Sequence, residues 1–147
     1  MKPALLEYLK SHLDARMNAA FEAMQAAQNS ANQETKSSAG DKYETGRAMA
    51  QIERDRHAQL YDQIRQERTI LERIDINYVF ERVGLGALIQ TSAGIFFIAV
   101  SVGTIEIVGE KVVVVSPQSP LGASLMGRQK GDDFLFQQKK HVVHQII

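Results

Sequence analysis

A single break between two long helical patterns constrains this chain more than any other feature. Small and turn-forming residues interrupt a run rich in Ala, Leu, Gln, Glu and Arg once, within residues 37–47, and the helical pattern then resumes. Gly40 can take the positive φ that ends a helix or turns the chain. We therefore expect an antiparallel helical hairpin over residues 1–76, with residues 37–47 at its far end. The alternative is a coiled coil formed between two chains.

Both arms of this hairpin show an apolar stripe. Pro3 is accepted in the first turn of a helix, because its missing N–H would have no partner there. Apolar residues then recur at a mean spacing of 3.5, which is typical of a coiled-coil seam: Leu6, Leu9, Leu13, Met17, Ala20, Met24 and Ala27. The second arm, from about Asp41 to about Ile74, is charged over most of its surface. Its predicted stripe is Met49, Ile52, Leu60, Ile64, Leu71 and Ile74.

From about residue 77 the pattern changes to short runs rich in Val, Ile and Phe, which predict strands. The predicted strands are Ala87–Gln90, Gly94–Val100, Thr104–Val108, Lys111–Val115, Asp133–Gln137 and His141–Ile147. Ser119 can cap a short helix that begins at Pro120 and that Gly127 closes. The predicted fold class is α+β, with a coiled-coil hairpin over residues 1–76 and a small antiparallel β domain with one short helix over residues 77–147.

Charge and composition exclude several classes of protein. The chain has 17 basic and 17 acidic residues and no net charge, whereas proteins that coat nucleic acid or anionic membrane need a basic excess. It has no Cys, so disulfides and thiolate metal sites are excluded. The longest apolar run, Ile95–Val100, is far short of the roughly 20 residues that span a bilayer. Because charges follow soon after Met1, we expect no signal peptide and a cytoplasmic protein.

No self-contained catalytic constellation is evident. The run Gly84-Leu85-Gly86 precedes a strand, whereas a dinucleotide loop precedes a helix. Ser124 lacks the spacing of a nucleophile elbow. His141 and His144 are three apart in a predicted strand, so they face opposite sides, and His57 is predicted to be a surface residue without an acidic or His partner one turn away. We expect a protein that is not an enzyme on its own.

Asp41 and Glu44 form the most informative pair of charged residues. Carboxylates three apart on a helix lie on one face and can converge on one divalent cation. Two carboxylates are too few for a tight Mg²⁺ site, because Mg²⁺ prefers six oxygen ligands. They can complete a site whose other ligands come from a partner, and such a site can position water for phosphodiester hydrolysis. The alternative is a capping box, in which Asp41 and Glu44 satisfy backbone N–H groups.

Two segments of the chain resemble the Gre family of bacterial transcript-cleavage factors. Gly40-Asp41-x-x-Glu44 is similar to the family's Gly-Asp-x-x-Glu, at nearly the same distance from the N-terminus. The segment Ser119–Asp132 is similar to the family's Ser-Pro-(apolar)-…-Leu-(apolar)-Gly-…-Gly-Asp segment. This family has an N-terminal antiparallel coiled coil with two acidic residues at its end, followed by an FKBP-like domain. The resemblance therefore implies that the β domain is FKBP-like.

The resemblance also implies a function. Such a protein docks on RNA polymerase, and its coiled coil enters the secondary channel toward the 3′ end of the transcript RNA. There Asp41 and Glu44 would help to hold a Mg²⁺ shared with the polymerase and orient the attacking water, so that backtracked transcripts are cleaved. Gln118, Ser119 and Pro120 would lie near the docking surface. We expect a monomer without sequence-specific DNA or membrane binding.

The chain also departs from the family. After the Glu, the family usually continues Asn-Ala-Glu-Tyr, whereas this chain has Thr45-Gly46-Arg47-Ala48. Lys42 and Arg47 add positive charge beside the carboxylates and would compete for them. A regulator that occupies the channel without stimulating cleavage is therefore an alternative. An FKBP-like isomerase or chaperone with a helical arm, and a structural coiled-coil adaptor, are the other two alternatives.

Overall fold

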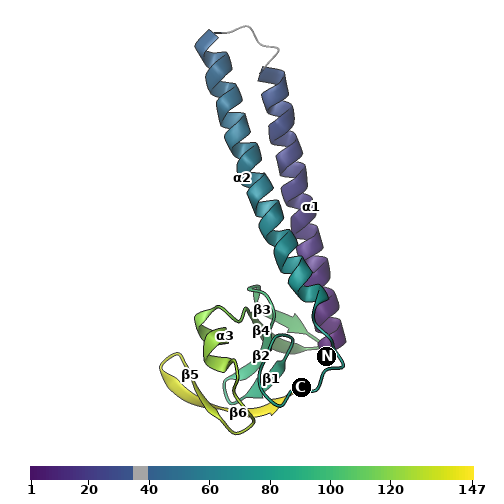
Figure 1. Cartoon of the computed structure of the whole chain (residues 1–147), viewed down its shortest axis with the longest axis vertical. Coiled ribbons are helices and arrows are strands. Elements are labelled where there is room, and N and C mark those ends of the chain that lie inside the picture. The colour runs from purple at the N-terminus through teal and green to yellow at the C-terminus, as the bar shows by residue number, and fades with distance from the viewer. Residues whose placement is uncertain (35–39) are drawn as a thin grey trace. The chain divides into compact units, whose positions relative to one another are not determined.

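The structure is a computed structural model of the chain (Figure 1). It describes the backbone of residues 1–34 and 40–147 and the side chains of residues 1–33 and 44–147. In this part of the chain, two long helices are followed by four strands, a short helix and two further strands. The order confirms the predicted α+β class.

By packing, the chain divides into two compact units. One is Leu9–Thr69, and the other combines Met1–Tyr8 with Ile70–Ile147. We call the second one the β unit. The domain boundary predicted at residue 76 remains a prediction from the sequence.

Helices α1 (Lys2–Glu34) and α2 (Gly40–Glu72) have 33 residues each and lie side by side in Figure 1. Each is about 50 Å long at the rise of an α-helix. The predicted stripe of α1 is confirmed, because Leu9 and Leu13 are fully buried and Ala20 is 4% exposed. The stripe continues one step further than predicted, to Ala31, which is 2% exposed.

The predicted stripe of α2 is correct only in its C-terminal half. Ile64, Leu71 and Ile74 are buried, whereas Met49, Ile52 and Leu60 are exposed to 63%, 65% and 40%. The reason is rotation about the helix axis. Arg54 and Tyr61 contact α1, and Ile52 lies two residues from Arg54, which is about 200° around the helix. Ile52 therefore faces away from α1, whereas Leu60 lies at the edge of the seam and lines a hollow with Ala20 and Ala23 of α1.

The six strands form one sheet in the order β3-β4-β2-β1-β6-β5. They are β1 (Leu88–Thr91), β2 (Gly94–Ile98), β3 (Gly103–Ile107), β4 (Glu110–Val115), β5 (Asp133–Phe136) and β6 (Lys139–Ile146). Every predicted strand is present, with ends that differ by two residues at most. The pairings are antiparallel as predicted, except that β2 and β4 are parallel. This exception arises because β3 pairs outside β4, so that β4 returns beside β2 in the same direction.

The core of the β unit lies on both faces of the sheet. One face gathers a cluster of buried side chains: Val83, Ala87, Ile89, Phe96, Ile98, Leu125, Phe134 and Val143. Leu125 reaches this cluster from α3 (Pro120–Leu125). Residues that alternate with these along the strands, such as Leu88, Phe97 and Val112, are also buried. Strands of mainly apolar residues fit a sheet whose centre is covered on both sides.

Candidate functional site at the end of the hairpin

Three contacts between α1 and α2 fix how the hairpin is paired. Arg68 Nε donates to Asp14 Oδ1 at 2.9 Å, and the rings of Phe21 and Tyr61 lie 6.1 Å apart between centroids. Arg54 Nη1 donates to Gln28 Oε1 at 3.0 Å. The two residue numbers of every pair add to 82, and successive pairs are seven residues apart on each helix. The helices are therefore antiparallel with one such contact per heptad, as in a coiled coil.

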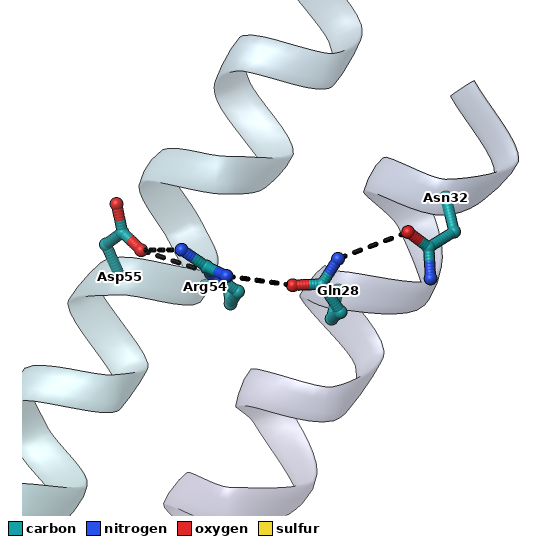
Figure 2. Close-up of polar contacts among 4 residues, drawn as sticks. All are labelled: Gln28, Asn32, Arg54 and Asp55. Carbon is teal, nitrogen blue, oxygen red and sulfur yellow. Dashed lines mark hydrogen bonds and ion pairs between the residues drawn. The ribbon is translucent and has the colours of Figure 1, made fainter. Parts of the chain in front are cut away.

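The contact farthest from the β unit along the sequence is polar (Figure 2). Arg54 also donates from Nε and Nη2 to Asp55 Oδ1, at 3.1 and 2.6 Å. Gln28 Nε2 donates to Asn32 Oδ1 at 3.2 Å. These bonds link four side chains of α1 and α2 in a row, where the seam of α1 consists of small residues such as Ala27 and Ala31. Because small side chains bury little apolar area, hydrogen bonds here set the pairing.

The ends of the two helices locate the predicted acidic pair, Asp41 and Glu44. α1 ends at Glu34 and α2 begins at Gly40. Asp41 and Glu44 are thus the second and fifth residues of α2, at the end of the hairpin that is formed by the connection between the helices.

Of the two acidic side chains, the structure describes only that of Glu44. That of Asp41 lies outside the described side chains, whereas Glu44 is exposed to solvent. The bounds of α2 place Asp41 inside the helix, whereas a capping box requires the first member just before it. Positions three apart in a helix lie on the same side. Asp41 and Glu44 therefore both lie in the first two turns of α2.

A positive charge lies close to this pair. Arg47 is exposed, and it follows Glu44 by three residues, which places both on the same side of α2. Arg47 also precedes Arg54 by one heptad. Lys42, the other predicted competitor, has a side chain outside the described ones.

The predicted docking loop, Gln118-Ser119-Pro120, is held in one conformation by hydrogen bonds. Ser119 Oγ accepts from the backbone N–H of Gly122 at 3.0 Å and donates to the carbonyl of Ser116 at 2.8 Å. This confirms Ser119 as the N-cap of α3, with Pro120 as its first residue. Gln118 and Pro120 are exposed on either side of the cap.

Gly122 explains why this loop is so compact. A Cβ atom at this position would lie 1.8 Å from the carbonyl oxygen of Ser116. No side chain fits at that distance, so glycine is the one residue that lets the loop close against α3.

The histidines form no metal site with their described neighbours. Contrary to the prediction, His57 has an acidic partner one turn away, because its Nε2 lies 3.6 Å from Glu53 Oε2. His141 Nδ1 lies 3.2 Å from Ser92 Oγ, and His144 is on the other side of β6. Within residues 1–33 and 44–147, no group of three or more His, Asp or Glu side chains could hold a metal ion.

The aromatic residues that an isomerase would need are largely in the core. Phe96, Phe97 and Phe134 are at most 2% exposed, so they cannot line an open proline pocket. Tyr78 and Phe80 instead line a pocket of about 380 Å³ that the sequence did not predict. Its signal in the sequence is a short aromatic and apolar run, residues 78–80, placed between Arg73 and Arg82 without helical or strand periodicity. Among the described residues, no helix combines the length and the hydrophobicity needed to cross a bilayer.

Comparison with known proteins gives matches only among solved structures. No protein-family model matches the chain, and no curated protein does. Among solved structures, the chain is similar to one described as "Structure of the transcription factor Gfh1", with 20% sequence identity. The alignment covers 93% of this chain and 92% of that chain, with a TM-score of 0.37.

Proposed function

We propose that this protein is a Gre-like transcription elongation factor that binds RNA polymerase and stimulates cleavage of backtracked transcripts. The observation that supports it most is that α1 and α2 pair antiparallel and that Asp41 and Glu44 are among the first five residues of α2. In the proposal, the hairpin enters the secondary channel with this end first, in the cytoplasm, as a monomer.

The donor atoms of the acidic pair suit Mg²⁺. Carboxylate oxygens are its preferred ligands, and two of them leave room for ligands from a partner. In the proposal, Asp41 and Glu44 would hold this Mg²⁺ together with ligands from the polymerase. When bound, the ion would supply a more acidic water molecule and stabilise charge on the phosphate oxygens. The exposed carboxylate of Glu44 accepts a hydrogen bond from the attacking water and thereby orients it toward the transcript. The protein is then a cofactor of the polymerase and not an enzyme alone.

The docking loop has a second role in this proposal. Gln118, Ser119 and Pro120 contact the polymerase at the mouth of the channel. The hydrogen bonds of Ser119 hold the loop before binding, so little conformational entropy is lost when the exposed Gln118 and Pro120 meet the partner.

The test uses backtracked elongation complexes with labelled RNA and the polymerase of the same organism. The variant Asp41→Asn/Glu44→Gln keeps the shape of both side chains and removes their charge. We expect cleavage to slow about 100-fold or more, while the affinity for polymerase stays within about twofold. The matched control is Asp62→Asn, because Asp62 is an exposed carboxylate of the same helix. Unchanged cleavage in the double variant would refute the proposed role of the acidic pair.

One observation favours a second candidate, a regulator that occupies the channel without cleavage. Arg47 lies on the side of α2 that carries Glu44, and a guanidinium there can neutralise the carboxylate. In that case the wild-type protein binds polymerase but leaves the cleavage rate at its intrinsic level. Arg47→Ala distinguishes the candidates further. If Arg47 neutralises Glu44, removal of this competing cation should raise the rate of transcript cleavage and not reduce it.

A further inference from the structure

A pocket in the β unit has no role in the function proposed above. It is formed by the segment between the end of α2 and the start of β1, and its volume is about 380 Å³. Its walls are Arg73, Asp75, Tyr78, Phe80, Arg82 and Gly84, with Leu85. A second hollow adjoins it, because Tyr78 and Arg82 line both.

The aromatic wall of the pocket is held in place from behind. The rings of Tyr78 and Phe80 meet edge to face, with centroids 4.7 Å apart. The ammonium of Lys2 lies 4.8 Å from the centroid of Phe80, and Lys2 is only 6% exposed. The backbone at Gly84 approaches Phe80 so closely that an added Cβ would lie 3.3 Å from the ring. Phe80 is therefore fixed, while Tyr78 is 59% exposed and can contact a ligand.

The charges of the pocket favour an anionic group. Arg73 and Arg82 contribute two guanidinium groups, against the single carboxylate of Asp75. Asp75 Oδ1 already accepts from the backbone N–H of Asn77 at 2.9 Å. Arg82 uses one nitrogen on the carbonyl of Gly127 at 3.2 Å, and Arg73 has no ion pair among the described side chains. Most guanidinium donors are thus available, and arginine binds carboxylates through paired hydrogen bonds.

The surface around the pocket favours a protein over a small ligand. Val79 is 82% exposed and Ile76 is 40% exposed, next to Tyr78. Exposed apolar residues that adjoin one another mark interaction sites, and aromatic residues with arginine are typical of protein interfaces. Glu81 lines only the adjoining hollow.

The pocket is also linked to the helix that the predicted docking loop begins. Arg82 bonds to Gly127, two residues after α3 ends, and Ser119 caps the other end of that helix. With six residues, α3 is about 10 Å long. One partner surface of ordinary size, about 800 Å², can cover both ends.

We propose that this pocket is a second docking site for RNA polymerase, and that it binds an acidic segment of the polymerase that also carries an apolar side chain. The acidic group pairs with Arg73 and Arg82, and the apolar side chain packs on Tyr78 and Val79. This inference rests on the proposed function, because it takes the polymerase as the partner.

Substitutions at Val79 test whether the polymerase segment that binds this pocket is acidic. At 82% exposure, Val79→Asp and Val79→Lys should both fold, which thermal melting checks. We expect Val79→Asp to weaken polymerase binding about tenfold at low salt and less at high salt. Val79→Lys loses the same apolar contact but adds a positive charge, so it should bind more tightly than Val79→Asp at low salt. Equal binding by both variants and the wild type would overturn the inference.

Because the chain has no Cys, a single thiol can report contact directly. A photo-crosslinker is attached to the thiol of Val79→Cys. The control is Lys111→Cys with the same crosslinker, because position 111 is exposed on β4. We expect a crosslink to polymerase from position 79 and not from position 111, with the attached peptide rich in Asp or Glu. A crosslink to a basic or neutral segment would contradict the proposal.

Further outcomes separate this inference from the proposed function. If the wild-type protein does not bind purified polymerase, the proposed function fails. If it binds and Arg73→Glu/Arg82→Glu binds equally well, only the pocket is excluded. Lys111→Glu/Lys140→Glu is the control for charge, because it makes the same change at two exposed lysines of the β unit. If ATP or GTP raises the melting temperature of the wild type but not of Val79→Asp, the pocket binds a nucleotide and the inference is wrong.

Discussion

The guanidinium of Arg68 donates a hydrogen bond from Nε to Oδ1 of Asp14, at 2.9 Å, and joins α2 to α1 across 54 positions of the sequence. The ion pair has a simple periodic relation to the rest of the hairpin. Seven residues further along each helix the rings of Phe21 and Tyr61 meet, and after another seven Gln28 accepts from Arg54. A contact that repeats with the heptad fixes the pairing of two helices more firmly than an apolar seam alone.

The first prediction concerns whether the hairpin forms within one chain. Since the natural chain has no Cys, Phe21→Cys/Tyr61→Cys introduces the only two thiols, at positions that face each other. We expect a short bis-maleimide to link them within one molecule, so that the product keeps the mass of a monomer in denaturing gels. A product of twice that mass would instead indicate a coiled coil between two chains. Phe21→Cys/Met49→Cys, which pairs position 21 with an outward one, should crosslink poorly.

The second prediction contrasts two isoleucines of α2. Ile64 is 1% exposed and Ile52 is 65% exposed. Truncation of a buried isoleucine leaves a cavity, so Ile64→Ala should lower the free energy of unfolding by about 2–5 kcal/mol. Ile52→Ala should change it by about 0.5 kcal/mol or less. Chemical denaturation monitored by helical circular dichroism measures both, and similar losses would show that both side chains face α1.

The third prediction concerns the glycine behind the docking loop. Gly122→Ala places a methyl group 1.8 Å from the carbonyl oxygen of Ser116, so the loop and α3 must move apart. We expect a loss of about 3 kcal/mol or more, because overpacking and a broken cap both contribute. The matched control is Gly127→Ala, which has open space around it but a φ of +79°. It should cost about 1–2 kcal/mol, the strain of the left-handed region. The reverse order of melting temperatures would contradict this account.

The fourth prediction is a pH dependence from Lys2. Burial lowers the pKa of the Lys2 ammonium, and the carboxylate of Asp75 raises it by a smaller amount. Since the unfolded chain holds this proton up to its usual pKa of 10.5, the unfolded state binds more protons at alkaline pH. The stability of the wild type should therefore rise as the pH increases through the folded pKa toward 10.5.

Lys2→Met checks this sign, because it keeps an apolar side chain without the charge. At neutral pH we expect the variant to be more stable by about 1 kcal/mol, since Lys2 Nζ is buried without a hydrogen-bond partner among the described residues. The difference should shrink as the pH is raised. A difference that is constant across the alkaline range would show that Lys2 does not titrate differently in the folded state.

Much of the fold follows from local patterns in the sequence. The spacing of Leu9, Leu13 and Ala20 predicts the buried side of α1, because side chains repeat with the turn of the helix. Ser119 and Pro120 predict the start of α3, because an N-cap interaction involves only residues that are close in the sequence.

The rest depends on long-range contacts that no local pattern contains. On α2, the positions that face α1 include Arg54 and Arg68, so polar residues occupy the seam where periodicity predicts apolar ones. The parallel pairing of β2 with β4 depends on where β3 lies in the sheet. For the candidate site, the sequence motif singles out residues 41 and 44, and the bounds of α2 place both at the start of that helix. The pocket beside Tyr78 was not predicted, because its walls come from an irregular segment whose short aromatic run has no periodicity.

The β unit combines distant parts of the sequence, and this has a consequence for folding during synthesis. This unit includes residues 1–8 as well as β6, and β6 pairs with both β1 and β5. Its sheet cannot be completed until β6 leaves the ribosome, whereas Leu9–Thr69 has emerged long before. The hairpin can therefore form while translation continues, whereas the first turns of α1 pack in their unit only after residues 70–147 have been synthesised.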